Sequence, residues 1–256
     1  MNGLFDTHCH LMSPVFVEED LNNILEEAKL IGVNLILNVG YDYETSKLAI
    51  DQSMLSTSIF AAIGIHPNDI HKENDDVLEK LETLIQTGNV SAIGEIGLDY
   101  YRSNDTKQIQ KEWLKKQIIL AKKYNLPILL HIRDAFDDAY EIVKEQDINK
   151  GILHSYTGDL QTALKFIKLG FYISFSGIIT FENAKDLQEV VKKIPLNNVV
   201  LETDSPYLTP HPFRGTRNYP KNIIFTAKKL AVLKQVPLNE VIKTTTNNAK
   251  KVLLIE

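Results

Sequence analysis

Short runs of aliphatic and β-branched residues alternate along the chain with longer stretches in which apolar residues recur at helical spacing. Some of these runs, such as Leu35-Ile36-Leu37, contain no polar position, which is typical of strands covered by helices on both faces. The runs predict eight strands, at residues 3–8, 34–39, 59–65, 90–96, 127–132, 151–154, 171–174 and 199–203.

The amphipathic stretches between these runs predict helices, including residues 18–31, 107–124, 160–169, 222–234 and 238–248. Eight strand–helix units in 256 residues give 32 residues per unit, about the size of a βα repeat with its loops. No linker or internal repeat interrupts the alternation, so we predict one domain over residues 1–256 with the (β/α)8 TIM barrel fold. The competing architecture is an open doubly wound sheet, which usually has fewer strands.

Residues 204–220 form the longest predicted loop and contain four prolines and one glycine. A loop of this length in a compact domain is usually functional or disordered, and its polar content favours function.

The amino-acid composition excludes several classes of protein and of metal site. The chain is 44% hydrophobic and 24% charged, as in ordinary globular proteins, and no apolar run approaches the roughly 18 residues that a membrane helix needs. The first residues show no basic segment followed by an apolar run, so we expect no secretory signal and a cytoplasmic location. The only cysteine is Cys9, which excludes an internal disulfide and a zinc site built from several cysteines. Any bound metal must therefore use histidines and carboxylates.

The net charge of −5 argues against non-specific coating of nucleic acid, although it allows a local basic site. The arginines are few and lie after predicted strands: Arg102, Arg133, Arg214 and Arg217. Barrel enzymes carry their chemistry at the carboxyl ends of the strands. All the histidines lie at or just after predicted strand ends, namely His8, His10, His66, His71, His131, His154 and His211.

The spacing of His8 and His10 predicts a chelating pair, because residues two apart on a strand point to the same side. Cys9 then points the other way, as an inert packed thiol. Asp6 shares the parity of the two histidines and is expected to orient one of the rings. Asp204 ends the eighth strand, which neighbours the first in a closed barrel, so it is expected to approach both histidines.

Glu95 is a carboxylate in an otherwise apolar strand end, flanked by glycines. Glu95 belongs to a predicted group of six metal-binding side chains. Six ligands are more than one ion usually needs, but they suit two divalent ions bridged by a carboxylate. We expect Mg, Mn, Zn or Ni, with the identity left open. The predicted ligands are His8, His10, Glu95, His131, His154 and Asp204.

Each of these residues also has a purely structural interpretation. Glu95 could pair with Arg133 in a buried ion pair, and Asp204 could only cap the turn that follows it. For His66 and His211 a hydrogen-bonded core role and a functional role are equally open.

The ordered motifs resemble those of the TatD family of metal-dependent deoxyribonucleases, within the metal-dependent hydrolase barrels. They span almost the whole chain: FDTHCHL at 5–11, GIHP at 64–67, GEIGLDY at 94–100, LHIR at 130–133, HSYTG at 154–158, ETDSPYL at 202–208 and RGTRN at 214–218. The resemblance implies a TIM barrel in which Glu95 bridges two ions. One ion is held by His8, His10, Glu95 and Asp204, and the other by Glu95, His131 and His154. It also implies 3′-to-5′ exonuclease activity on single-stranded DNA. Thr216 departs from the lysine that is common in relatives.

The predicted reaction is hydrolysis of DNA phosphodiester bonds by water activated between two metal ions. Asp204 and Glu95 are the predicted catalytic residues, with Asp204 orienting the water and accepting its proton. Guanidinium groups bind phosphate in a bidentate manner, and tyrosines can stack an unpaired base. The predicted substrate contacts are His66, Arg133, Tyr156, Arg214 and Arg217.

We expect a monomer with DNA as its partner and no membrane association. The alternative function is hydrolysis of a small amide, lactone or ester, including the ester of an aminoacyl-tRNA, by the same ligand set. A barrel that binds without catalysis is disfavoured by the complete ligand set.

Overall fold

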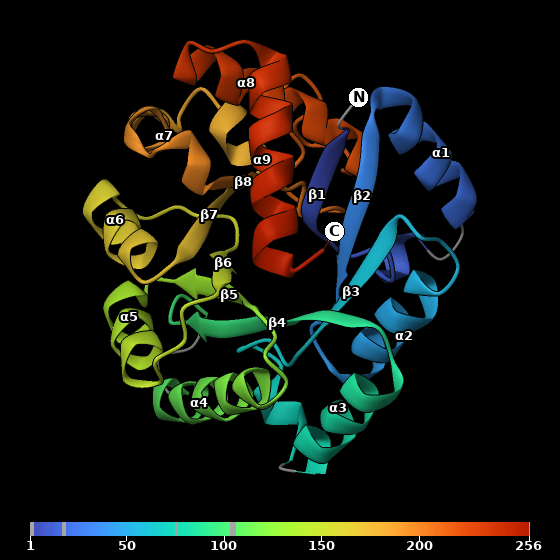
Figure 1. Cartoon of the computed structure of the whole chain (residues 1–256), viewed down its shortest axis with the longest axis vertical. Coiled ribbons are helices and arrows are strands. Elements are labelled where there is room, and N and C mark those ends of the chain that lie inside the picture. The colour runs from blue at the N-terminus through green and yellow to red at the C-terminus, as the bar shows by residue number, and fades with distance from the viewer. Residues whose placement is uncertain (1–2, 17–18, 75, 103–105, 256) are drawn as a thin grey trace.

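The computed structural model describes residues 3–16, 19–74, 76–102 and 106–255. Its centre is a sheet of eight parallel strands in consecutive order, with helices outside it (Figure 1). The strands are β1 (Leu4–Cys9), β2 (Val33–Val39), β3 (Ile59–Ile63), β4 (Val90–Asp99), β5 (Ile128–Arg133), β6 (Gly151–Leu153), β7 (Phe171–Phe175) and β8 (Val199–Leu201).

The helices follow the strands in alternation and form the outer ring (Figure 1). They are α1 (Leu21–Ile31), α2 (Tyr43–Ser53), α3 (Asp76–Thr87), α4 (Lys107–Lys123), α5 (Phe136–Glu145), α6 (Leu160–Lys168), α7 (Lys185–Lys193), α8 (Ile223–Lys234) and α9 (Leu238–Leu253). Short 3-10 helices lie at Pro14–Phe16, Ile70–Lys72, Gly177–Thr180, Leu196–Asn198 and Pro220–Asn222.

Contacts between the first and last strands bring the sheet to near closure. Cys9 and Ser205 form a parallel bridge, and the backbone N–H of His10 donates to the carbonyl of Ser205 at 2.8 Å. The carboxylate of Asp6 accepts hydrogen bonds from the backbone N–H and the hydroxyl of Thr203, at 2.8 and 2.6 Å. The predicted barrel is therefore confirmed, and the open doubly wound sheet is excluded by the consecutive strand order.

The interior of the barrel is filled by apolar side chains from alternate positions of the strands, including Phe5, Leu37 and Leu129. Helix α9 covers the amino-terminal end of this interior. The hydroxyl of Thr246 donates to the carbonyl of Gly3 at 2.9 Å, ahead of β1. The carboxyl-terminal ends of the strands form the opposite end of the barrel, which α9 does not cover.

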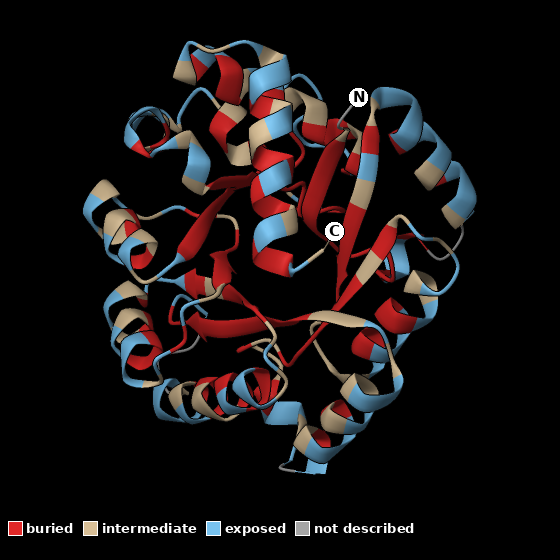
Figure 2. Cartoon of the chain, in the orientation of Figure 1, coloured by how far each residue is buried: buried red, intermediate tan, exposed pale blue. Residues whose placement is uncertain are grey.

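A second, larger core cluster lies between the strands and the surrounding helices. The strands are buried along most of their length, and the helices alternate between buried and exposed positions (Figure 2). Trp113, Leu114 and Ile118 of α4 are buried on one face, as the helical spacing predicted.

The bounds of some elements differ from the predictions. Helix α9 runs to Leu253 rather than 248 because Ala249 and Val252 pack against the barrel interior. Helix α1 begins at Leu21, after Asp20 accepts a hydrogen bond from the backbone N–H of Asn22. The predicted start of that helix, residue 18, lies outside the described residues.

The far end of the predicted loop at 204–220 is held to the end of β8 by the buried side chain of Asn218. The amide nitrogen of Asn218 donates to the carbonyls of Thr203 and Tyr207, at 2.9 and 2.7 Å. This contact joins the far end of the loop to the end of β8 and fixes the path of the chain beside the barrel mouth.

Across the described residues, no helix combines the length and the apolar character that crossing a bilayer demands.

Candidate metal centre

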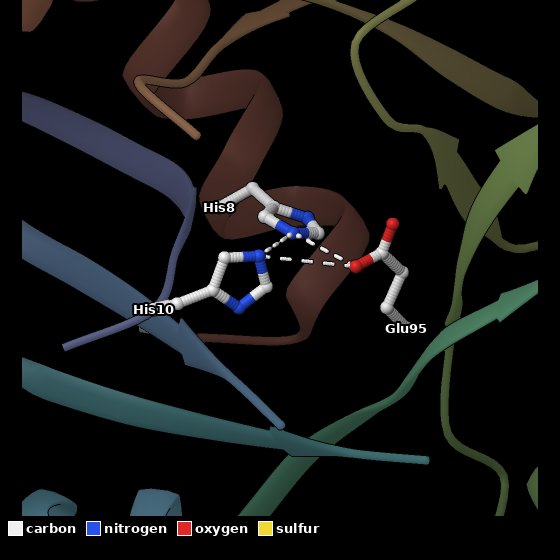
Figure 3. A group of neighbouring side chains, drawn as sticks. All are labelled: His8, His10 and Glu95. Carbon is white, nitrogen blue, oxygen red and sulfur yellow. Dashed lines mark hydrogen bonds and ion pairs between the residues drawn. The ribbon is translucent and has the colours of Figure 1, made fainter. Parts of the chain in front are cut away.

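The carboxyl ends of the strands carry a compact group of imidazole and carboxylate side chains (Figure 3). His8 lies in β1, His10 follows β1 by one residue, and Glu95 lies in β4. Nε2 of His8 is 3.3 Å from Nε2 of His10 and 3.5 Å from Oε2 of Glu95. Both histidines therefore point to the same side, as the parity of the strand predicted.

Glu95 lies between two groups of histidines, and each of its carboxylate oxygens faces one group. Oε2 is 3.5 Å from Nε2 of His8 and 3.9 Å from Nε2 of His10. Oε1 is 2.9 Å from Nδ1 of His131 and 3.6 Å from Nε2 of His154. This division of the two oxygens would allow the carboxylate to bridge two cations.

Asp204 joins the group from the end of β8. Its Oδ1 atom is 3.5 Å from Nε2 of His10 and 3.9 Å from Nε2 of both His8 and His154. Its backbone N–H donates to the carbonyl of His8 at 2.8 Å, which holds the chain at this position. A φ of 59° places Asp204 in the left-handed region, which is uncommon for residues other than glycine.

Close packing of β4 against β5 explains the two glycines beside Glu95. A Cβ atom at Gly94 would lie 2.5 Å from Cβ of Leu129, and one at Gly97 would lie 1.9 Å from the carbonyl oxygen of His131. Gly97 also has a φ of 151°. A larger residue at either position would separate the strands and move Glu95 away from His131.

Electrostatics favour positive charge inside this group. Burial raises the pKa of Glu95 and of Asp204, but the surrounding histidines outweigh it and hold both pKa values below their usual range. Burial opposes protonation of His154, yet Glu202, Glu95 and Asp204 raise its pKa to about 10. Two ionised carboxylates in a buried site stabilise cations among them, whether protons on the imidazoles or metal ions in their place.

Two of the predicted ligands are oriented by acceptors behind them. Nδ1 of His10 is 2.7 Å from the carbonyl oxygen of Val39, so this nitrogen carries the ring proton and Nε2 presents its lone pair to the group. Nε2 of His131 is 3.2 Å from Oδ2 of Asp99, which also accepts from the side-chain amide of Asn68 at 3.0 Å.

His66 has the opposite arrangement. The backbone N–H of Asn68 donates to its Nδ1 atom at 3.1 Å, and burial lowers its pKa to about 3. The neutral ring must therefore carry its proton on Nε2, which is 3.6 Å from Oε1 of Glu95. His66 can donate a hydrogen bond into the site, but it has no lone pair directed there for a metal ion.

The donor atoms fit divalent metal ions. His8, His10 and Glu95 each offer one atom within 4.8 Å of the others, and His66, Glu95 and His131 form a second such group, in which the proton on Nε2 of His66 leaves Glu95 and His131 as the donors. Imidazole nitrogens mixed with carboxylate oxygens are typical ligands of zinc, manganese, iron and nickel. The chemistry of the residues therefore agrees with the predicted pair of cations.

A profile of the family described as TatD related DNase matches residues 5–254. The chain belongs to the TatD family.

Similar proteins support this assignment over the full length. The chain is 43% identical over 254 residues to the uncharacterized metal-dependent hydrolase YabD of Bacillus subtilis, covering 98% of this chain and 99% of the relative. It is 36% identical over 257 residues to the uncharacterized metal-dependent hydrolase YcfH of Escherichia coli K12, covering 99% and 96%. The crystal structure of YjjV, a TatD homologue from Escherichia coli, has a TM-score of 0.94 at 31% identity, covering 99% and 98%. The chain is thus a metal-dependent hydrolase with the TIM barrel fold of its family.

A cavity of about 790 Å³ opens at the mouth of this TatD-family barrel. Five of the six predicted ligands line this cavity. The sixth, His8, is buried and is not part of the lining that the described residues form. Ligands that reach the cavity can contact a substrate as well as a cation. These lining ligands are His10, Glu95, His131, His154 and Asp204.

Arg133 and His66, two of the predicted substrate contacts, also line the cavity. The guanidinium carbon of Arg133 lies 3.7 Å from the ring centroid of Tyr101, which is 65% exposed. Arg133 is exposed and does not pair with Glu95, so the buried ion pair considered as an alternative is absent. Arg102 lines the same cavity.

The other predicted substrate contacts lie outside the lining that the described residues form. Tyr156 is 2% exposed, and its hydroxyl donates to the carbonyl of Asp159 at 2.5 Å. Arg214 packs its guanidinium 4.2 Å from the ring centroid of Phe181. Arg217 forms an ion pair with Glu19.

Two acidic residues near the ligands were not singled out from the sequence. Asp99 accepts from His131, and Oε1 of Glu202 is 2.9 Å from Nδ1 of His154. Both stand inside the quoted motifs and share the parity of a predicted ligand, Asp99 with Glu95 and Glu202 with Asp204. Strand parity was thus the signal that could have identified them.

Asp6 has a different role from the one expected. Its carboxylate binds Thr203 on the neighbouring strand and receives the backbone N–H of His8 at 3.4 Å. It therefore fixes β1 against β8 rather than orienting a histidine ring.

Proposed function

We propose that this TatD-family enzyme hydrolyses phosphodiester bonds of DNA and removes nucleotides from single-stranded ends. The observation that carries this proposal is the composition of the cavity. The carboxylates and imidazoles around Glu95 form one part of its lining, which we call the base, and Arg102 and Arg133 belong to another part, which we call the wall. A cationic wall beside a metal centre suits a substrate with a phosphate at the reacting bond.

We assign the first cation to His8, His10, Glu95 and Asp204, and the second to Glu95, His131 and His154. The separate directions of the two Glu95 oxygens support a bridging role. Two divalent ions, when bound, lower the pKa of water and neutralise charge that develops on the phosphoryl oxygens.

Asp204 is the residue that we assign to orient the attacking water and accept its proton. Its carboxylate lines the cavity, and its lowered pKa keeps it ionised at neutral pH. An ionised carboxylate within the reacting group can act as a general base.

His66 is assigned as a donor to the substrate. Its protonated Nε2 faces the same space as Oε1 of Glu95, and its neutral state persists over the physiological pH range. An N–H group fixed in this way can donate to a non-bridging phosphate oxygen without competing for the cations.

Arg133 and Arg102 are assigned to the phosphates that flank the reacting bond, because guanidinium groups bind phosphate with two parallel hydrogen bonds. Tyr101 and Tyr207 are 65% and 58% exposed at the cavity and offer ring faces to unpaired bases. Stacking on such rings tolerates any base, which favours single strands over duplex DNA.

Nuclease assays with defined metal content test the proposal. Protein stripped by a chelator is reloaded with Mg, Mn, Zn or Ni and incubated with labelled single-stranded DNA, duplex DNA, RNA and a panel of lactones, amides and aminoacyl esters. We expect metal-dependent release of nucleotides from single-stranded DNA. Hydrolysis of the small-molecule panel without cleavage of DNA would overturn the proposal in favour of the alternative function.

We further propose that the chain acts as one domain and as a monomer, because one chain supplies every residue assigned to the cavity. Light scattering on the active, metal-loaded protein tests this, and a stable dimer would contradict it.

A further inference from the structure

Four buried polar atoms beneath the metal centre have no hydrogen-bond partner among the described residues. They are Nδ1 of His8, Nδ1 of His154 and both carboxylate oxygens of Glu202. Glu202 is 0% exposed and follows β8 by one residue. A buried carboxylate or imidazole N–H without a partner is costly, so these atoms require an explanation.

Nδ1 of His154 lies beside the carboxylate of Glu202, whereas no ring nitrogen of His8 lies within 4.0 Å of a Glu202 oxygen among the described residues. Nδ1 of His154 is 2.9 Å from Oε1 of Glu202, although the two atoms are not aligned for a hydrogen bond in this conformation. The rings of His8 and His154 stack with centroids 3.6 Å apart and planes 25° apart. One ligand atom from each of His8, His154 and Glu202 lies within 4.8 Å of the others.

The other ring nitrogens of these two histidines, their Nε2 atoms, face the metal centre. Nε2 of His8 is 3.5 Å from Oε2 of Glu95, and Nε2 of His154 is 3.6 Å from Oε1 of Glu95. In Figure 3 only one ring nitrogen of His8 carries dashed lines, and the other is turned away from Glu95 and His10. An imidazole that presents the lone pair of Nε2 to a cation must carry its proton on Nδ1.

Protonation of both Nδ1 atoms accounts for all four unpaired atoms at once. It creates an N–H donor on His154 at 2.9 Å from one Glu202 oxygen and a second donor on His8, within 4.8 Å of this group, which reaches the other unused oxygen after a small shift of the ring or the carboxylate. The other two histidine ligands already have such acceptors, Val39 for His10 and Asp99 for His131.

We propose that Glu202 is a positioning residue whose carboxylate accepts the Nδ1–H groups of His8 and His154 together. It fixes both rings in the form that binds a cation through Nε2. His8 is assigned to bind the first cation and His154 the second. A single Glu202 carboxylate behind both rings therefore links the orientation of a ligand of one cation to that of a ligand of the other. This inference rests on the proposed ligand set.

Glu202→Gln tests it, because glutamine keeps the size of the side chain but retains only one acceptor oxygen. The matched control is Glu189→Gln on the exposed face of α7. Both variants and the wild type are stripped of metal, and the number of ions bound and their dissociation constants are measured by titration with Zn²⁺ or Mn²⁺ against a competing chelator. Thermal unfolding of the stripped proteins checks the fold.

We expect two ions per chain in the wild type and in Glu189→Gln. In Glu202→Gln the affinity for at least one ion should fall about 10- to 100-fold, the usual effect of losing an acceptor behind a metal-bound histidine, with little change in Tm. In addition, ¹⁵N-resolved NMR of the zinc-loaded wild type should show two solvent-protected histidine Nδ1–H signals that Glu202→Gln shifts or loses.

Affinities in Glu202→Gln within about twofold of the wild type for both ions would overturn the inference. So would binding of a third ion that Glu202→Gln removes, because Glu202 would then be a ligand itself. Wild-type protein that binds no divalent ion would overturn both this inference and the proposed ligand set. Binding of two ions without cleavage of DNA would overturn only the proposed nuclease activity.

Discussion

The base and the wall of the cavity are built in different ways. At the base, Glu95 and Asp204 are buried; Glu95 lies in β4, and Asp204 follows β8 by three residues and is held by its backbone hydrogen bond to His8. On the wall, Arg133 and Tyr101 are exposed, and the guanidinium group of Arg133 packs over the ring of Tyr101. The base is thus held by the barrel itself, whereas the wall consists of long, exposed side chains at the end of β5 and in the turn after β4.

This difference separates two functions within one site. Cation binding requires donor atoms held to within a fraction of an ångström, which short side chains on packed strands provide. Substrate binding tolerates adjustment, and long, exposed arginine side chains can follow the path of a flexible strand. Variants at the base should therefore change metal content and turnover, and variants on the wall should change substrate affinity.

Replacement of the bridging residue should have the largest effect. Glu95→Gln removes the negative charge that both cations share, so kcat should fall by about 10³-fold or more and metal content should fall with it. Steady-state kinetics and elemental analysis of the same sample measure the two quantities. Glu112→Gln on the exposed face of α4 is the matched control, and retention of two ions by Glu95→Gln would show that the bridge is misassigned.

His66→Ala should separate turnover from metal binding at the base. Loss of its Nε2–H group should lower kcat about 100-fold, because one donor to the reacting phosphate is removed, while two ions remain bound. His71→Ala, at an exposed histidine of the same loop, is the control. Loss of an ion from His66→Ala would instead make His66 a ligand and contradict its assigned tautomer.

Arg133→Ala should raise KM for single-stranded DNA about tenfold, leave metal content unchanged and weaken the salt dependence of binding. Arg133→Lys keeps the charge but not the planar fork, so its KM should lie between those of the wild type and Arg133→Ala. Binding measured over a range of salt concentrations tests this. A fall in kcat with KM unchanged would contradict the assignment of Arg133 to substrate binding and would indicate a role in the chemical step.

Arg217→Ala should have the smallest effect, with KM changed by less than about twofold, because its guanidinium is paired with Glu19 at the surface. The hydroxyl of Tyr219 donates to the same carboxylate at 3.0 Å, so Glu19 has two partners in this loop. A KM increase as large as that of Arg133→Ala would show that the pair opens when DNA binds. Glu19→Gln, which frees the guanidinium, should then lower KM.

The sequence predicted the architecture well because periodicity and topology depend on local patterns. Apolar runs marked all eight strands, and the positions of the histidines at strand ends predicted one polar face. The expected approach of Asp204 to His8 and His10 also followed from strand order alone, since the last strand of a barrel meets the first.

Long polar side chains were less predictable. Arg133 ends β5 and lines the cavity, whereas Arg217 lies in the loop after β8 and pairs with Glu19 in the segment between β1 and α1. Tyr156 lies two residues after the predicted ligand His154 but is buried, and its hydroxyl donates to the carbonyl of Asp159. In each case the outcome depends on a neighbour that is distant in sequence or on the direction of one turn.

The sequence by itself therefore determined the barrel, the family and the group of residues that meet at its mouth. Only the tertiary structure decided which nitrogen of each histidine faces the centre, which acceptors lie behind the rings, and which arginines reach the cavity. The physical reason is that strand identity and parity follow from short-range hydrophobic spacing, whereas tautomers and side-chain contacts follow from hydrogen-bond partners supplied by other strands and loops.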